Sequence, residues 1–296
     1  MKTIPSIDKR LSHAYSLREQ IVKSKIKLFQ DNQFDIQCER FDNDLGIRLI
    51  LKSFLVQTTL DDIGLLFGDC IHNLRSALDN LAYELACQKC NPPKKPRSIS
   101  FPIMKNSSGF SSKAKICLEQ LPKNAANLIE SIQPFQRDGS PANGTPESDL
   151  LGLLHDIDLI DKHRIPSPVL LNPQEHNHSF SYDLTENEFA LPEMIYFRQE
   201  PLEKDCILFE FKFPHRIHVH GEYNMSFILS FIINDRRFEV EELLNLLFFY
   251  TNQTINLFRD FFPNNPDIDN GNLVFIDVIK DENGFQFIPH DQTPGT

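Results

Sequence analysis

One stretch of the sequence, residues 68–86, "GDCIHNLRSALDNLAYELA", carries polar side chains at helical spacing within an otherwise apolar pattern. At about 100° per residue, an α-helix collects these side chains into a single stripe opposite its apolar side. The stripe consists of His72, Ser76, Asp79 and Tyr83, with Arg75 at its edge. An imidazole, a guanidinium and a carboxylate at this spacing can form ion pairs, bind an anion or transfer protons. The ordinary alternative is a polar helix face exposed to water.

A second helical stretch, residues 150–164, "LLGLLHDIDLIDKHR", places charges on its apolar side. Steps of four and three residues in turn connect Leu150, Leu154, Ile157, Asp161 and Arg164. Charges that continue an apolar stripe point toward a core, where an ion that loses its partner costs about 3–5 kcal/mol. We therefore expect Asp161 and Arg164 to have partners of opposite charge.

The two stretches carry complementary charges, because each offers an arginine and an aspartate. We predict that the helices around residues 57–88 and 147–164 cross and that these four charges meet. The predicted network consists of His72, Arg75, Asp79, Asp161, Lys162, His163 and Arg164. Two interpretations remain open: a latch of ion pairs that holds the helices together, or a pocket for a phosphate or carboxylate.

Four histidines occur as two pairs of alternate residues, in segments expected to be strands. Alternation places both members of a pair on one face of a strand. The pairs are His176/His178 and His218/His220. Together they could ligate zinc or iron, which accept imidazole ligands. Histidines on strand surfaces are common and no "H-E-x-x-H" motif occurs, so we expect neither a bound metal nor another cofactor.

The elements that must position these residues follow from the hydrophobic periodicity. Long helices are predicted at about residues 8–30, 59–87, 147–164 and 239–262, with short helices around 111–120 and 122–132. A β-hairpin is predicted at 34–56, and six strands between 168 and 233 are separated by turns rich in Asn, Pro, Asp and Gly. A further strand is expected in the tail, at "NLVFIDVI".

This order of elements indicates an α+β protein. We predict a bundle of about four main helices with an antiparallel sheet inserted before the last helix. We expect a single domain over residues 1–296, with a helical part at about 1–165 and 238–262 and a mainly strand part at about 166–236.

The composition limits the classes of function. A net charge of −11, spread without blocks of one sign, argues against a general phosphate-binding surface. No run of 18 apolar residues occurs, and the first residues, "MKTIPSIDKR", lack the apolar core of a signal peptide. Six scattered cysteines are too few to cross-link a chain of 296 residues through disulfides. We expect a cytoplasmic protein that does not enter a membrane.

The combination of "HNLRSALDNLAYELA", a following "FPI" at residues 101–103 and "DIDLIDKHR" resembles a group of uncharacterised bacterial proteins in which such helices recur. More distantly, residues 60–165 are similar to HEPN domains, helical bundles of bacterial defence and toxin systems, many of which cleave RNA. The resemblance implies RNA as a partner, a homodimer that joins two copies of the site, and His72 or His163 as catalytic residues. The HEPN spacing, an arginine with a histidine four to six positions later, is not found after Arg75 or Arg164.

We favour a non-catalytic cytoplasmic binding or interaction protein, whose polar site between two bundle helices holds an anionic ligand or a partner. The sequence contains no phosphate-binding glycine loop, nucleophile elbow or other familiar catalytic motif. The alternatives are a divergent HEPN-like ribonuclease that uses the same residues and a metal-dependent hydrolase that uses the strand histidines.

Overall fold

The computed structural model describes residues 4–31, 34–54, 57–140, 144–163, 169–173, 179–184, 193–224, 227–233, 236–262, 276–281 and 284–289. At residues 31, 57–59, 161–163, 179–184, 217–224, 276–281 and 284–289 it describes the backbone alone. The chain forms two compact units. The first comprises Met1–Ile21, Leu65–Ser167 and Glu241–Thr296, and the second comprises Val22–Gly64 and Pro168–Val240.

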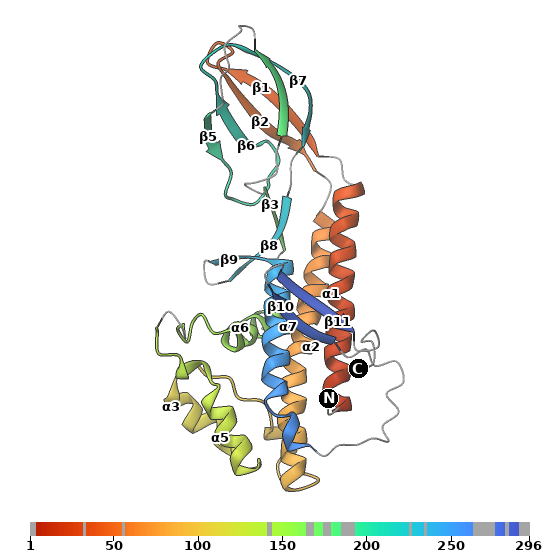
Figure 1. Ribbon diagram of the computed structural model, residues 1–296, viewed down its shortest axis with the longest axis vertical. Coiled ribbons are helices and arrows are strands. Elements are labelled where there is room, and N and C mark those ends of the chain that lie inside the picture. The colour runs from red at the N-terminus through yellow and green to blue at the C-terminus, as the bar shows by residue number, and fades with distance from the viewer. Residues whose placement is uncertain are drawn as a thin grey trace. The chain divides into compact units, whose positions relative to one another are not determined.

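Four long helices contribute to the first unit (Figure 1). They are α1 Pro5–Asp31, α2 Gln57–Lys89, α6 Leu150–His163 and α7 Val240–Asn256. The short helical pieces are η1 Pro96–Ser98, α3 Ser107–Gly109, η2 Phe110–Ala114, α4 Lys115–Leu118, α5 Lys123–Ser131, η3 Pro134–Gln136 and η4 Arg259–Phe261, and β10 Ile276–Asp281 pairs with β11 Gly284–Pro289. None of the helices in the described ranges has the length and apolar composition that spanning a bilayer requires.

The apolar side predicted for the second helix is the buried side of α2. Its fully buried residues in the first unit include Phe67, Cys70, Ile71, Leu74, Ala77, Leu78, Leu81 and Leu85. The other long helices of the unit bury Ile7, Ala14, Leu154, Ile157, Leu244 and Leu247. Burial of one such large apolar side chain stabilises the fold by about 1.5–3 kcal/mol, so this face fixes the orientation of α2.

Polar contacts set the neighbouring helices of the first unit in register. The thiol of Cys70 on α2 donates to the carbonyl oxygen of Ala14 on α1 at 3.3 Å. Arg18 Nε on α1 donates to Asn245 Oδ1 on α7 at 2.8 Å. The three helices run side by side in Figure 1 as these bonds require.

The second unit is built mainly from antiparallel strands. They are β1 Asp35–Phe41, β2 Gly46–Ser53, β3 Leu170–Pro173, β4 Ser179–Leu184, β5 Glu193–Phe197, β6 Cys206–Lys212, β7 Ile217–Asn224, β8 Phe227–Ile233 and β9 Arg236–Glu239. They form a four-stranded sheet of order β1-β2-β6-β5, a three-stranded sheet of order β3-β8-β9 and the pair β4-β7 (Figure 1). In the largest sheet, Leu49 of β2 lies opposite Cys38 of β1 and Phe209 of β6.

The turn of the β1–β2 hairpin follows from its sequence. Asp42, Asn43 and Asp44 have φ values of 54°, 56° and 69°. Aspartate and asparagine adopt this left-handed conformation more readily than other residues with side chains, so "DNDLG" closes the predicted hairpin.

The predicted fold class is confirmed: the protein is α+β, with long helices toward both ends of the chain and antiparallel strands before the last long helix. The sequence pattern predicts neither β9 nor β11. The "RRFE" of β9 is too short and too charged to show the alternation of a half-buried strand. The expectation of a single domain stays a prediction.

Helix α6 begins later than the predicted start at about residue 147. Residues 146–148 form a turn, and the helix begins at Leu150. Asp149 caps it, because Asp149 Oδ1 accepts from the backbone N–H groups of Leu151 at 2.9 Å and of Gly152 at 3.2 Å. A carboxylate at this position satisfies free N–H groups and faces the positive end of the helix dipole.

A buried ion pair joins α1 to η4 in the first unit. Arg259 Nη2 donates to Asp8 Oδ1 at 2.9 Å, and the two side chains are 9% and 3% exposed. Asp8 Oδ2 also accepts from the backbone N–H of Ile4 at 2.7 Å. The carboxylate therefore binds both the start of α1 and the end of the C-terminal helical region.

We predict that Asp8→Ala lowers the free energy of unfolding by about 3–5 kcal/mol, because it leaves the Arg259 guanidinium buried without its counter-charge. Urea denaturation measures the change. The control is Glu119→Ala, which removes a carboxylate from the exposed pair with Lys115 at 4.0 Å and should change stability little. Equal effects of the two substitutions would contradict the assignment.

Candidate functional site

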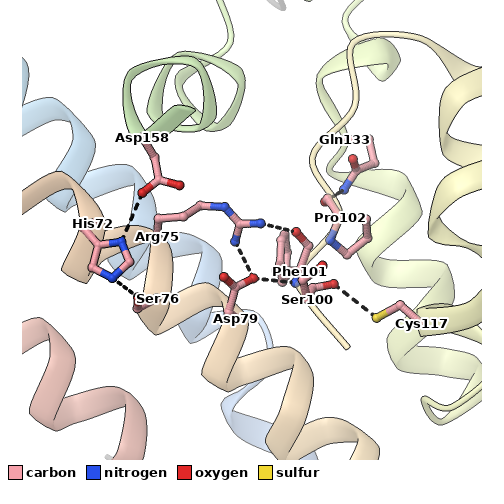
Figure 2. Close-up of polar contacts among 10 residues, drawn as sticks. All are labelled: His72, Arg75, Ser76, Asp79, Ser100, Phe101, Pro102, Cys117, Gln133 and Asp158. Carbon is pink, nitrogen blue, oxygen red and sulfur yellow. Dashed lines mark hydrogen bonds and ion pairs between the residues drawn. The ribbon is translucent and has the colours of Figure 1, made fainter. Parts of the chain in front are cut away.

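Arg75 extends from α2 into the protein and binds two oxygens of the chain itself (Figure 2). Its Nη1 donates to Asp79 Oδ1, one turn further along α2, at 2.7 Å. Its Nη2 donates to the carbonyl oxygen of Phe101, also at 2.7 Å. The side chain is only 8% exposed. Arg75 thus connects α2 to the segment that follows η1.

Asp79 also binds Phe101, through the backbone N–H of that residue. Asp79 Oδ1 accepts from the backbone N–H of Phe101 at 2.8 Å, so both backbone polar groups of Phe101 are bound by α2. Hydrogen bonds with a charged partner are shorter and stronger than neutral ones. The Phe101 ring is fully buried and packs edge-on against Phe258, with ring centroids 6.3 Å apart.

The neighbours of Phe101 are held in the same way, so we call residues 100–104 the inlaid segment (Figure 2). The carbonyl oxygen of Ser100 accepts from Cys117 Sγ at 3.2 Å. Gln133 Nε2 donates to the carbonyl oxygen of Pro102 at 2.8 Å, and Gln133 Oε1 accepts from the Met104 N–H at 3.0 Å. The inlaid segment is neither helix nor strand, so side chains must satisfy its buried backbone groups.

His72 connects α2 to α6 (Figure 2). Its Nδ1 lies 3.3 Å from Oδ1 of Asp158, whose side chain is 3% exposed, whereas the imidazole is 45% exposed. Its Nε2 lies 3.4 Å from Ser76 Oγ. With the proton on Nδ1, the imidazole donates to the carboxylate and accepts from the hydroxyl.

His155 of α6 belongs to this site, although the sequence pattern does not single it out. Its Nδ1 is buried and has no hydrogen-bond partner among the residues that the structure describes. Burial lowers the pKa of His155, the charge of Arg75 lowers it further, and three nearby aspartates oppose the shift. The sequence indicates the burial of His155 only through its position directly after Leu154, near the buried side of α6.

The predicted residues at the end of α6 are described only in part. Asp161, Lys162 and His163 lie in the last turn of α6, where the structure gives the backbone alone, and Arg164 lies outside the described residues. The pairing of these residues with α2 therefore stays a prediction. The α6 carboxylate that the structure does place against α2 is Asp158, which the sequence pattern does not single out.

Ser76, His72 and Asp158 are in contact in the order nucleophile, base, acid. The distance of 3.4 Å between Ser76 Oγ and His72 Nε2 is longer than the about 2.6–3.2 Å of an activated nucleophile. Ser76 also lies within α2, where backbone N–H groups bond inside the helix and cannot form an oxyanion hole. The arrangement is therefore better suited to joining α6 to α2 than to acyl transfer.

The strand histidines are placed only in part. His218 and His220 lie in β7, opposite Asp183 and Ser181 of β4, and only the backbone is described there. His176 and His178 lie outside the described residues. Among the side chains that the structure does describe, no group of three His, Cys, Asp or Glu residues could hold a metal ion. The expectation that the two pairs bind no metal stays a prediction.

Comparisons of this chain with models of protein families, with curated proteins and with solved structures find no match. The resemblance to HEPN domains therefore stays a prediction. The function has to be argued from the chemistry of the site, because a fold class alone does not determine an activity.

We predict that Asp79→Ala lowers the free energy of unfolding by about 2–3 kcal/mol, because Arg75 loses its counter-charge and the Phe101 N–H loses its acceptor. Arg75→Met should also destabilise the protein. The double variant Arg75→Met/Asp79→Leu should not recover stability, because both backbone groups of Phe101 remain buried and unpaired. Recovery in urea denaturation would indicate that the two side chains only neutralise each other.

We predict that His155 makes the protein less stable in acid. A histidine in the unfolded chain has a pKa of about 6.5, and the lowered pKa in the folded state means that the unfolded chain binds the proton first as the pH falls. Its contribution is complete above about pH 6.5 and is lost as the pH falls through the lower, folded-state pKa. His155→Gln should reduce the difference in unfolding free energy between about pH 7.5 and pH 5.5, and an unchanged difference would contradict this assignment.

Proposed function

We propose that this protein is a non-catalytic cytoplasmic binding or interaction protein, in which the polar site of α2 acts as a structural clamp. The observation that carries the proposal is that both hydrogen bonds of Arg75 end on the chain itself, at Asp79 and Phe101. An arginine that serves a ligand or a transition state keeps donors accessible to it. The Arg75 side chain is instead 8% exposed and supports the inlaid segment.

The local charge also favours a clamp over an anion pocket at Arg75. Asp79, Asp156 and Asp158 all act electrostatically on His155, so three carboxylates lie near the same imidazole as Arg75. Two negative charges repel by about 1 kcal/mol at 4 Å in water and more strongly where solvent is excluded. The ligand or partner is therefore expected on another surface of the protein.

One observation favours a ribonuclease as a second candidate. His72 is half exposed and contacts the buried carboxylate of Asp158, and general acid–base catalysis uses such pairs. The HEPN-like resemblance gives the same class of activity. The metal-dependent hydrolase would depend on strand histidines whose side chains are not described.

We predict that the purified chain cleaves neither short RNA nor an activated ester above background, with or without a chelator, because Ser76 has no oxyanion hole and Arg75 is inaccessible. Gel analysis of the RNA and release of nitrophenol from the ester are the measurements. RNA cleavage that is lost in His72→Ala or His163→Ala would make the protein a ribonuclease. A chelator-sensitive activity would support the metal-dependent hydrolase. Lys9→Gln, at an exposed position of α1, is the control in each assay.

A further inference from the structure

A short basic loop precedes the inlaid segment. Its sequence at residues 91–98 is "NPPKKPRS", and Lys94, Lys95 and Arg97 are all exposed. Within the described part of the chain, no carboxylate lies within ion-pair distance of any of these three cations. The carboxylate of Glu119 pairs with Lys115 and not with a cation of this loop. Three unneutralised cations in eight residues are unusual in a chain with a net charge of −11.

The basic loop borders an open pocket of about 370 Å³. The lining residues are Lys95, Pro96, Arg97 and Ser98. This volume falls in the range of about 300–1,000 Å³ that small-molecule sites occupy. The pocket is open and its lining is mostly apolar, whereas the charged groups of Lys95 and Arg97 stay exposed to solvent beside it.

Gln120 fixes the shape of this loop. Gln120 Oε1 accepts from the backbone N–H of Lys95 at 2.7 Å, and Gln120 Nε2 lies 3.4 Å from the Lys95 carbonyl oxygen and 3.5 Å from Ser98 Oγ. Ser98 Oγ donates to the same carbonyl oxygen at 2.9 Å. The clamp of Arg75 and Asp79 holds Phe101 just beyond the loop. A loop held at both points loses little conformational entropy when a ligand binds.

We infer that this pocket binds a small phosphorylated compound, with phosphoryl oxygens contacting Lys95 and Arg97. A phosphate carries about −1.5 to −2 charges at neutral pH and accepts bonds from the arginine fork and the lysine ammonium together. A long nucleic acid fits less well, because the acidic remainder of the chain repels an extended polyanion. The inference rests on the proposed binding function, for which it supplies a ligand class and a site separate from Arg75.

Isothermal titration of the full chain with inorganic phosphate and with inorganic pyrophosphate tests the inference. Wild-type protein should bind pyrophosphate saturably. Lys95→Gln/Arg97→Gln should lower the affinity by at least about tenfold, because it removes two charge-assisted hydrogen bonds. The charge-matched control, Lys9→Gln/Lys27→Gln, changes two exposed lysines of α1 and should stay within about twofold of wild type.

The variant Gln120→Leu distinguishes a shaped binding site from nonspecific electrostatic attraction. It leaves every charge in place but removes the bonds that shape the loop, so it should also weaken pyrophosphate binding. Unchanged affinity in Gln120→Leu, equal loss in the control variant, or no binding of either anion would overturn the inference. Tighter binding of short RNA than of pyrophosphate through the same two cations would replace it with a nucleic-acid surface. His72-dependent turnover, measured separately, would contradict the proposed function and leave these titrations intact.

Discussion

The structure of the first unit depends on one constraint: residues 101–103 of the inlaid segment are buried although they have no regular secondary structure. Its backbone N–H and C=O groups cannot bond to a helix or a sheet, and burial without partners would cost about 1–3 kcal/mol for each group. Side chains supply the partners. Arg75 and Asp79 bind Phe101, Cys117 binds Ser100, and Gln133 binds both Pro102 and Met104.

This constraint explains why α2 carries charged residues beside a fully apolar face. The apolar face packs the helix in the core, and the charged residues at its border bind the main chain that lies against it. His72 extends the same stripe to Asp158 on α6. The residues of the stripe thus have different roles, because Arg75 is buried and organises the neighbouring segment, whereas Tyr83 is 39% exposed and borders solvent.

The helices, the hairpin and most strands can be predicted from the sequence, because their periodicity and turn residues are local properties. The polar stripe of α2 is predictable for the same reason. Its partner is not, because a carbonyl oxygen such as that of Phe101 is present in every residue and leaves no mark in the sequence. The contact of Asp158 with His72 depends on the rotation of α6 about its axis, which tertiary packing sets. His155 looks like an ordinary helical residue until the burial of its Nδ1 is known.

Arg75 and Asp79 contact the main chain of Phe101, whereas the ring of Phe101 contacts Phe258. These two sets of contacts therefore constrain the sequence in different ways as it diverges. The clamp requires a backbone shape and is indifferent to the side chain at position 101, so that residue can change in step with residue 258 as the core is repacked. Arg75 and Asp79 bind main-chain groups that every residue except proline would present at position 101, and they are therefore the less replaceable pair.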